Sequence, residues 1–335
     1  MRGMFLLALA TAVAAQTTPG PIQPFGDWAV ACDNVRRCEM TSLQPADGDI
    51  ETNGTELSLV REPGAEGELS ITVWPPEDAQ GAPSLTIDGG RIEGGSVRQG
   101  ALRFGGVAAQ RLATALANGH AARIVAGAGE KTGDISLAGA SAALRFIDAQ
   151  QGRAGGVTAL VARGTKPASA VPAVAPLPVV AGLAPGHTRA TISRALLAQM
   201  NKMSGCDAEY DRDFPQAPAE TGALGDGATL VLLPCGSGAY NMLSAAFVVR
   251  AGKPVRATFD NEPRGLDGEL INVSWDAGTG TLSTHAKARG IGDCGEAVTY
   301  AWDGSRFRAT QIDRMDECRG SANWLTVWRA EVRRR

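Results

Sequence analysis

The sequence has few of the residues from which metal and redox sites are built. Only 3 of its 335 residues are histidine. These histidines are far apart in the chain, so they do not have the spacing of zinc ligands. None of the 6 cysteines forms a C-x-x-C pair, which argues against a zinc ribbon and against a thioredoxin-like redox motif. We therefore expect neither a metal nor a cofactor.

Signals for catalysis, nucleic-acid binding and membrane insertion are also missing. Ser237 lies in Cys-Gly-Ser-Gly, which does not have the G-x-S-x-G spacing of a nucleophile elbow. Lys and Arg total 32 against 35 Asp and Glu, a formal net charge of −3, so no basic nucleic-acid surface is indicated. After residue 13 no apolar run approaches the roughly 20 residues of a membrane span. We expect no nucleic-acid partner and no membrane span.

The N-terminus has the pattern of an export signal. Arg2 precedes an apolar run at residues 4–13, and Val13-Ala14-Ala15 is an A-x-A-like cleavage site. We predict a signal peptide at residues 1–15 and a periplasmic or secreted protein. In such a protein an even number of cysteines indicates disulfides. The six are Cys32, Cys38, Cys206, Cys235, Cys294 and Cys318.

A Pro-, Ala- and Val-rich stretch at residues 164–186 (GTKPASAVPAVAPLPVVAGLAPG) divides the chain. Such a composition is typical of an extended, semi-rigid linker. It predicts a first domain at residues 22–163 and a second at residues 187–335. If disulfides stay within domains, Cys32 pairs with Cys38. For the other four cysteines the connectivity stays open, and we expect sequence neighbours to pair, 206 with 235 and 294 with 318.

The hydrophobic pattern predicts a mainly β (α+β) protein. The first domain has short alternating stretches typical of strands, followed by two helical stretches at residues 107–118 and 136–149. The second domain begins with a helical stretch at residues 191–203 and continues almost entirely as strands. Asp303-Gly304 is a hairpin signal. The second domain is therefore expected to be a helix followed by an antiparallel β meander.

Several short segments resemble an exported proteobacterial family catalogued as domain of unknown function 1176. They are Phe-Gly-Asp-Trp at 25–28, Leu-Pro-Cys at 233–235, Gly-Ala-Tyr-Asn at 238–241, Arg-Gly-x-Gly-Asp-Cys-Gly at 289–295, and Trp-x-Gly-x-x-Phe at 302–307. The resemblance covers most of the mature chain. It implies a location and an architecture and no activity.

The first domain alone also resembles the invasion-associated locus B family. The shared elements are the Phe-x-Asp-Trp start at 25–28, the following cysteine pair, and Ser-Leu-x-Gly…Ala-Leu at 136–144 before a helix. Proteins of that family are associated with host-cell invasion. A shared fold does not imply a shared function, so assigning that role to this chain would rest on analogy alone.

Two clusters are candidates for a binding surface, because a rigid aromatic beside a charged turn suits recognition of a partner. The first cluster surrounds the small cysteine loop and the second lies in the other domain. The candidate residues are Trp28, Asp33, Asn34 and Arg36, and then Tyr240, Asn241, Arg289 and Asp293.

The leading functional hypothesis is a non-catalytic binding or envelope-associated protein whose ligand or partner is unknown. A first alternative is a hydrolase of cell-wall or saccharide material, in which Asp293 and Glu296 act as acid and base. A second alternative rests on Ser237–Tyr240, which resembles the Ser-Gly-Tyr loops of periplasmic lysozyme inhibitors. A site with two carboxyls facing one substrate would favour the first alternative.

Overall fold

The computed structural model shows a mainly β protein, as expected. It describes residues 17–47, 54–76, 79, 81–127, 131–189, 191–209, 215–261 and 268–335. The predicted signal peptide lies outside these residues and stays a prediction.

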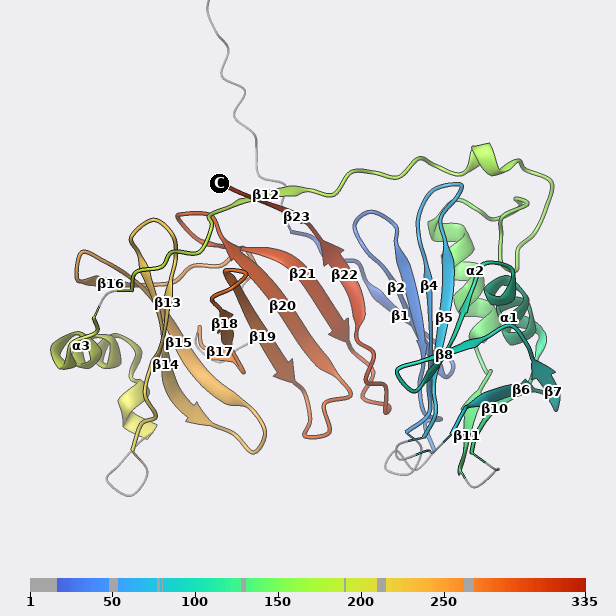
Figure 1. The fold of residues 1–335 in the computed structure, drawn as a ribbon, viewed down its shortest axis with the longest axis horizontal. Coiled ribbons are helices and arrows are strands. Elements are labelled where there is room, and N and C mark those ends of the chain that lie inside the picture. Colours follow the sequence, from blue (N-terminus) through green and yellow to red (C-terminus); the bar gives the residue numbers. More distant parts are fainter. Residues whose placement is uncertain are drawn as a thin grey trace, which may run out of the picture.

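The first half of the chain is built on a seven-stranded antiparallel sheet, in the order β1-β2-β3-β4-β5-β9-β8 (Figure 1). Its strands are β1 (Ile22–Phe25), β2 (Trp28–Cys32), β3 (Cys38–Ser42), β4 (Glu56–Arg61), β5 (Leu69–Trp74), β9 (Ala101–Gly105) and β8 (Ser96–Arg98). Strands β1 to β5 are neighbours in the order in which they follow one another in the sequence.

Two helices cover one face of this sheet, α1 (Gly106–Asn118) and α2 (Ala140–Gln150). Their apolar residues recur three and four positions apart, as on one face of a helix. A four-stranded sheet, β11-β10-β6-β7, completes the half. Its strands are β11 (Lys131–Ser136), β10 (Ala121–Ala126), β6 (Ser84–Ile87) and β7 (Gly90–Ile92).

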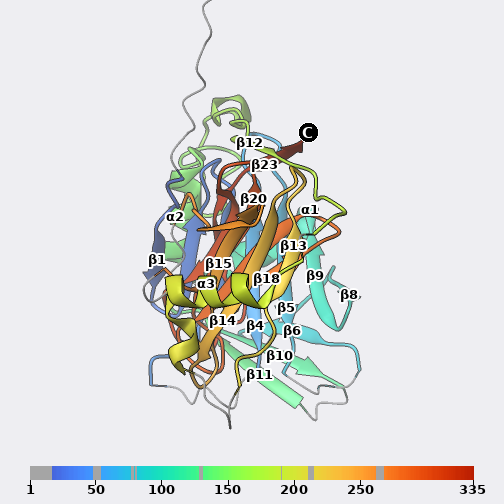
Figure 2. The same cartoon turned by 90° about the vertical axis from the view of Figure 1, so that its left-hand side faces the viewer.

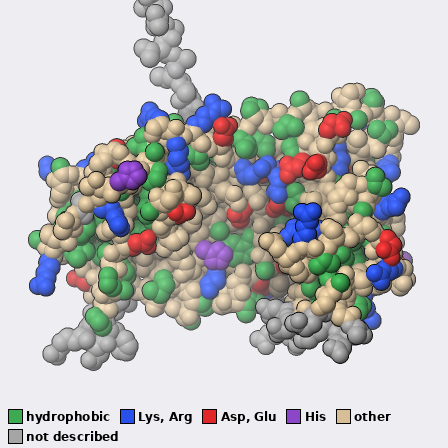
Figure 3. All heavy atoms as spheres, in the orientation of Figure 1, with side chains coloured by type: hydrophobic (Ala, Val, Ile, Leu, Met, Phe, Trp, Pro, Cys, Tyr) green, Lys and Arg blue, Asp and Glu red, His purple; other side chains and the backbone are tan. Residues whose placement is uncertain are grey.

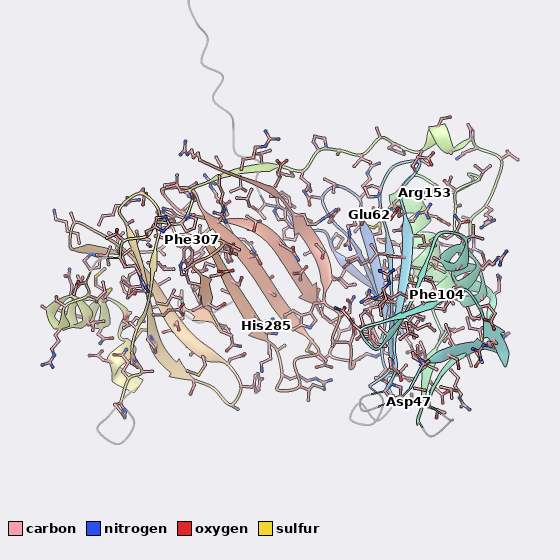
Figure 4. The ribbon with its side chains drawn as sticks, viewed as in Figure 1. Asp47, Glu62, Phe104, Arg153, His285 and Phe307 are labelled. Atoms are coloured by element: carbon pink, nitrogen blue, oxygen red, sulfur yellow. A yellow bond between two sulfur atoms is a disulfide. The ribbon has the colours of Figure 1, made fainter. Side chains whose placement is uncertain are left out.

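The second half contains two further antiparallel sheets that enclose a common core. One is β18 (Ser274–Asp276), β19 (Thr281–Lys287), β20 (Gly295–Trp302), β21 (Phe307–Met315) and β22 (Leu325–Arg329). The other is β13 (Glu220–Ala223), β14 (Thr229–Ser237), β15 (Met242–Arg250) and β16 (Lys253–Arg256), with β17 (Leu270–Ile271) paired to β15. Phe307, labelled in Figure 4, is fully buried in this core and stacks on Phe259 with 5.3 Å between ring centroids.

Helix α3 (Arg194–Ser204) lies on the outer side of β14 and β15, as Figure 2 shows. Ser193 caps it by accepting a hydrogen bond from the Leu196 amide. Leu196 and Met200 pack against Phe247 and its neighbours in a separate small core. The expected order of a helix followed by a β meander is confirmed.

The predicted linker runs along the surface and is held at its end. It contains a short 3-10 turn, η1 (Ala168–Ala170), and then β12 (Val179–Gly182). β12 pairs in parallel with β23 (Glu331–Arg334) at the C-terminus. Backbone pairing therefore fixes the last part of this segment, while the division into two domains stays a prediction.

The two halves share a buried interface. The β2 strand points Trp28 and Val30 toward α1 and α2, and points Ala29 and Ala31 toward the core of the second half. A strand that is covered on both faces is expected to read as a continuous apolar run. This explains Trp-Ala-Val-Ala at 28–31.

Three disulfides join all six cysteines, in the expected pairs Cys32–Cys38, Cys206–Cys235 and Cys294–Cys318. The last pair links the ends of β20 and β21, whose hairpin contains Asp303-Gly304 as predicted. The turn comprises residues 303–306 and is therefore longer than the two-residue turn that Asp303-Gly304 predicts. The Asp303 amide donates a hydrogen bond to the Arg306 carbonyl at 3.1 Å and closes this turn.

One expected helix boundary is wrong. The stretch from residue 136 to 139 is not helical, because Ser136 ends β11 and α2 begins only at Ala140. Gly139 has φ 96°, and a Cβ there would collide with the Phe25 carbonyl. This close approach of β1 requires glycine and sets the start of the helix.

Candidate functional site

The first predicted cluster places its aromatic residue in the core. Trp28 is 0% exposed, and its Nε1 donates to the Ser136 carbonyl at 3.0 Å. The indole is therefore a core residue whose polar atom is satisfied within the first half, and it offers no surface to a ligand.

The loop closed by Cys32 and Cys38 contacts the other half of the protein. The Asp33 carboxylate accepts from the Val35 and Arg37 amides at 2.9 and 2.8 Å, and from Arg329 Nε at 2.5 Å. Asn34 bonds both backbone groups of Arg329, at 3.0 and 2.8 Å. Of the four predicted residues, only Arg36 is exposed. This cluster therefore joins the halves of the molecule.

The second predicted cluster is brought together at one end of the second half. Tyr240 and Asn241 lie in the turn between β14 and β15. Tyr240 Oη donates to the Ala288 carbonyl at 3.0 Å, and Asn241 Nδ2 donates to the Lys287 carbonyl at 2.8 Å. These bonds attach the turn to the loop between β19 and β20.

Arg289 and Asp293 lie in that same loop and form an ion pair in which the Asp293 side chain is 5% exposed and the Arg289 side chain is 37% exposed. Arg289 Nε donates to Asp293 Oδ1 at 2.7 Å, and its Nη2 bonds the second oxygen and the Cys318 carbonyl. The Gly320 amide donates to Asp293 Oδ2 at 2.7 Å. Burial alone would raise the pKa of Asp293, but the hydrogen bonds from Arg289 and Gly320 outweigh it and lower that pKa.

Asp293 and Glu296 do not have the environment of an acid and base pair. Glu296 is buried on β20 opposite Arg314, whose Nε lies 3.8 Å from Glu296 Oε2. A general acid in glycoside hydrolysis needs a raised pKa, whereas the pKa of Asp293 is lowered. Both carboxylates are used in ion pairs, so the geometry gives the hydrolase alternative no support.

An exposed apolar surface adjoins the second cluster. Tyr240, Met242 and Ile291 lie in or next to the turn and the loop just described and are 39%, 52% and 60% exposed; we call these three residues the Tyr240 surface. Lys287 Nζ lies 5.8 Å from the centre of the Tyr240 ring, a cation–π arrangement. Met242 and Ile291 are not among the residues predicted from the sequence, because a strand or loop pattern does not show whether a single apolar residue is exposed.

His285 and Trp324 form a second aromatic group in the same half. Their rings stack with 4.4 Å between centroids, and Figure 4 labels His285 on β19. Burial, followed by the positive charge of Lys287, lowers the pKa of His285. His285 is therefore expected to be neutral at physiological pH.

One group of potential metal ligands exists among the described residues, and its chemistry does not fit a metal. Cys206, Cys235 and Glu269 offer ligand atoms within 4.8 Å of one another. The two cysteines are joined in a disulfide, so they present no thiolate to a metal.

The charges on the surface are mixed. On the face in Figure 3, Lys and Arg alternate with Asp and Glu, and no single-sign patch is visible. Within the part of the chain that the structure describes, no helix has the length and apolarity to cross a membrane.

The fold and these sites define a mainly β protein with three disulfides, whose two halves are interlocked by buried polar contacts. Residues 22–331 match the family described as "Protein of unknown function (DUF1176)", and the chain belongs to that family. The match spans both halves, as the resemblance of the short motifs predicted. The resemblance to the locus B family stays a prediction.

A relative with the printed name "Uncharacterized protein YpfG", from Escherichia coli (strain K12), is 30% identical over 351 aligned positions. The alignment covers 97% of this chain and 97% of the relative. No solved structure matches the chain.

Proposed function

We propose that this chain is an exported, non-catalytic binding protein of the cell envelope that docks on a partner protein through the Tyr240 surface. Export is supported by the N-terminal pattern and by the pairing of every cysteine, because disulfides persist in oxidising compartments. The Cys32–Cys38 loop contacts Arg329 in the second half of the same molecule, so it is not part of this binding surface.

The single observation that carries the proposal is that the turn with Tyr240 and Met242 is exposed and yet held in place by hydrogen bonds. Asn272 donates to Asn241 Oδ1 and to the His285 carbonyl, both at 2.8 Å, and accepts from the Met242 amide at 2.8 Å. A surface that is ordered before binding loses little conformational entropy when a partner docks. Tyrosine beside long apolar side chains is also typical of binding hot spots.

The charge around the surface suggests the kind of partner. Lys287 lies over the Tyr240 ring, while Arg289 is neutralised by Asp293. A partner with an apolar pocket and an acidic rim would complement this arrangement.

The test is retention of partner proteins from a periplasmic extract by the immobilised mature chain. We expect Tyr240→Ser combined with Ile291→Ser to abolish retention of the specific partner. Val97→Ser is the matched control, because Val97 is similarly exposed but lies in the first half. Equal retention by all three proteins would overturn the proposal, as would peptidoglycan turnover that is lost in Asp293→Asn.

A further inference from the structure

The first half contains a cleft of about 590 Å³ that includes none of the binding residues predicted from the sequence. It lies between the turn joining β4 and β5, the beginning of α1, and residues 157–163. Its volume is in the range of sites for small molecules.

A buried arginine without an ionic partner lines this cleft. Arg61, at the end of β4, is 5% exposed, and within the described part of the chain its Nε has no hydrogen-bond partner. Among the described residues no carboxylate forms an ion pair with it. A buried charge without a partner is costly, so an arginine retained in this state suggests that its partner is a ligand.

The neighbouring carboxylates are already engaged. Both oxygens of Asp148 accept from the backbone amides of residues 160–162, at 2.7 to 3.1 Å. Glu62 pairs with Arg37 at 2.9 Å. Asp148 remains the nearby negative charge that favours the charged form of Arg61, but its lone pairs are directed to the backbone.

A second arginine increases the local positive charge. Arg153 is 1% exposed, and no described residue forms a hydrogen bond with its Nη1. Figure 4 shows Arg153 and Glu62 at the same end of the first half, and Arg153 Nη2 donates to the Glu62 carbonyl at 3.4 Å. Burial, followed by the charge of Arg153, lowers the pKa of Arg61 to about 10, so Arg61 is still charged at neutral pH.

Two further donors line the same cleft. The Thr158 hydroxyl is buried and has no hydrogen-bond partner among the residues that the structure describes. Helix α1 begins at Gly106 without a side-chain cap and without an acidic residue in its first turn, and Gly105 and Gly106 line the cleft. The amides and the dipole at an uncapped helix N-terminus favour an anion.

We propose that this cleft binds a small oxyanion, a carboxylate or a phosphate group of a small molecule, with Arg61 as the principal ligand. Thr158 and the first amides of α1 complete the coordination of that group. Arg163 lies at the mouth and adds attraction. Glu66 and Glu68 also lie at the mouth, where both are exposed, and solvent and salt screen their repulsion.

The experiment is isothermal titration calorimetry of the mature protein with two probes, inorganic phosphate and succinate, which separate phosphate from carboxylate recognition. We expect at least one probe to bind the native protein. Arg61→Met should weaken that binding by at least roughly tenfold, because a hydrogen bond to a charged group contributes about 1.5–3 kcal/mol. Arg123→Met, which removes an exposed arginine paired with Asp134, should bind as the native protein does.

A purely structural role for Arg61 gives the opposite pattern. If Arg61 stabilises the fold, Arg61→Met lowers the unfolding temperature, and the folded fraction of the variant still binds the probe. That combination of results overturns the proposal. If Arg61 serves a ligand, the variant unfolds at the same or a higher temperature, because it buries no unpaired charge. Absence of binding by both probes to the native protein also overturns the proposal.

Thr158→Val provides a second variant that does not alter charge. It should weaken binding of the same probe by roughly threefold to tenfold. Unchanged affinity in this variant would contradict the coordination assigned to Thr158. This site and the Tyr240 surface lie in different halves of the protein, so the failure of one proposal leaves the other untouched.

Discussion

At the scale of single residues, burial separates the candidates into core and surface. Trp28 was expected at a binding loop and lies in the core, whereas Tyr240 is exposed. Both lie in or next to turns, and neither local sequence shows whether the ring is buried. Burial depends on which distant segment covers a strand, and no short motif contains that information.

Trp28→Phe is expected to lower the free energy of unfolding by about 1–3 kcal/mol, through lost volume and the lost bond to Ser136. Chemical denaturation measures this change, and retention of the partner should be unaffected. If a fully folded Trp28→Phe protein failed to retain the partner, Trp28 would have to be part of the binding surface.

The Asp293 ion pair makes stability depend on acid pH. Its folded-state pKa is lowered, so its contribution is present above the unfolded value of about 3.9 and is lost as pH falls through the folded value. Asp293→Asn should lower the free energy of unfolding by about 2–3 kcal/mol at neutral pH, and by less below pH of about 3. Thermal unfolding across pH measures both effects.

Asp134→Asn is the control for that series, since Asp134 and Arg123 are exposed partners. A surface pair contributes about 0–1 kcal/mol. If the two variants have the same pH profile, the Asp293–Arg289 ion pair is not the source of the acid dependence.

At the scale of elements, most helices and the disulfide pairing could be predicted, because both rest on local spacing. α1 and α3 begin within a few residues of the expected starts. The hairpin β10–β11 was not among the expected strands, although Ala122, Ile124 and Ala126 alternate inward. β10 pairs with β6, which lies more than thirty residues earlier in the sequence. This long-range pairing shows that β10 belongs to the four-stranded sheet, and a local pattern could not show it.

The three disulfides are expected to contribute unequally to stability. In the chain-entropy model the small Cys32–Cys38 loop contributes about 2 kcal/mol and each longer loop about 3.5 kcal/mol. Replacing each pair by serines and measuring denaturation by urea gives the order. A larger loss for the Cys32–Cys38 pair would show that this disulfide acts mainly by shaping the loop that binds Arg329.

At the scale of the whole molecule, buried carboxylates of the first half bind backbone amides of the second. Glu56 Oε1 accepts from the hydroxyls of Thr41 and Ser321 at 2.7 Å and from the Asn323 amide at 3.1 Å, and Oε2 accepts from the Ala322 amide at 3.1 Å. Glu39 accepts from the Thr326 amide at 3.0 Å. Contacts between distant segments of this kind leave no signal in a single sequence.

We expect the native protein to unfold in one calorimetric transition, because these contacts couple the halves. Glu56→Gln should lower the free energy of unfolding by about 2–3 kcal/mol, since it leaves buried donors unsatisfied. Glu93→Gln, at an exposed pair with Arg91, should change it by less than about 1 kcal/mol. Two separate transitions in the native protein would contradict the coupling.

The central claim, a docking surface on an exported protein, is tested most directly by site-specific photo-crosslinking in living cells. A photoreactive side chain at position 291 is predicted to give a discrete protein adduct in the envelope fraction. The same side chain at position 97, an exposed site in the other half, is predicted to give none. No adduct at position 291, or the same adducts at both positions, would contradict the account.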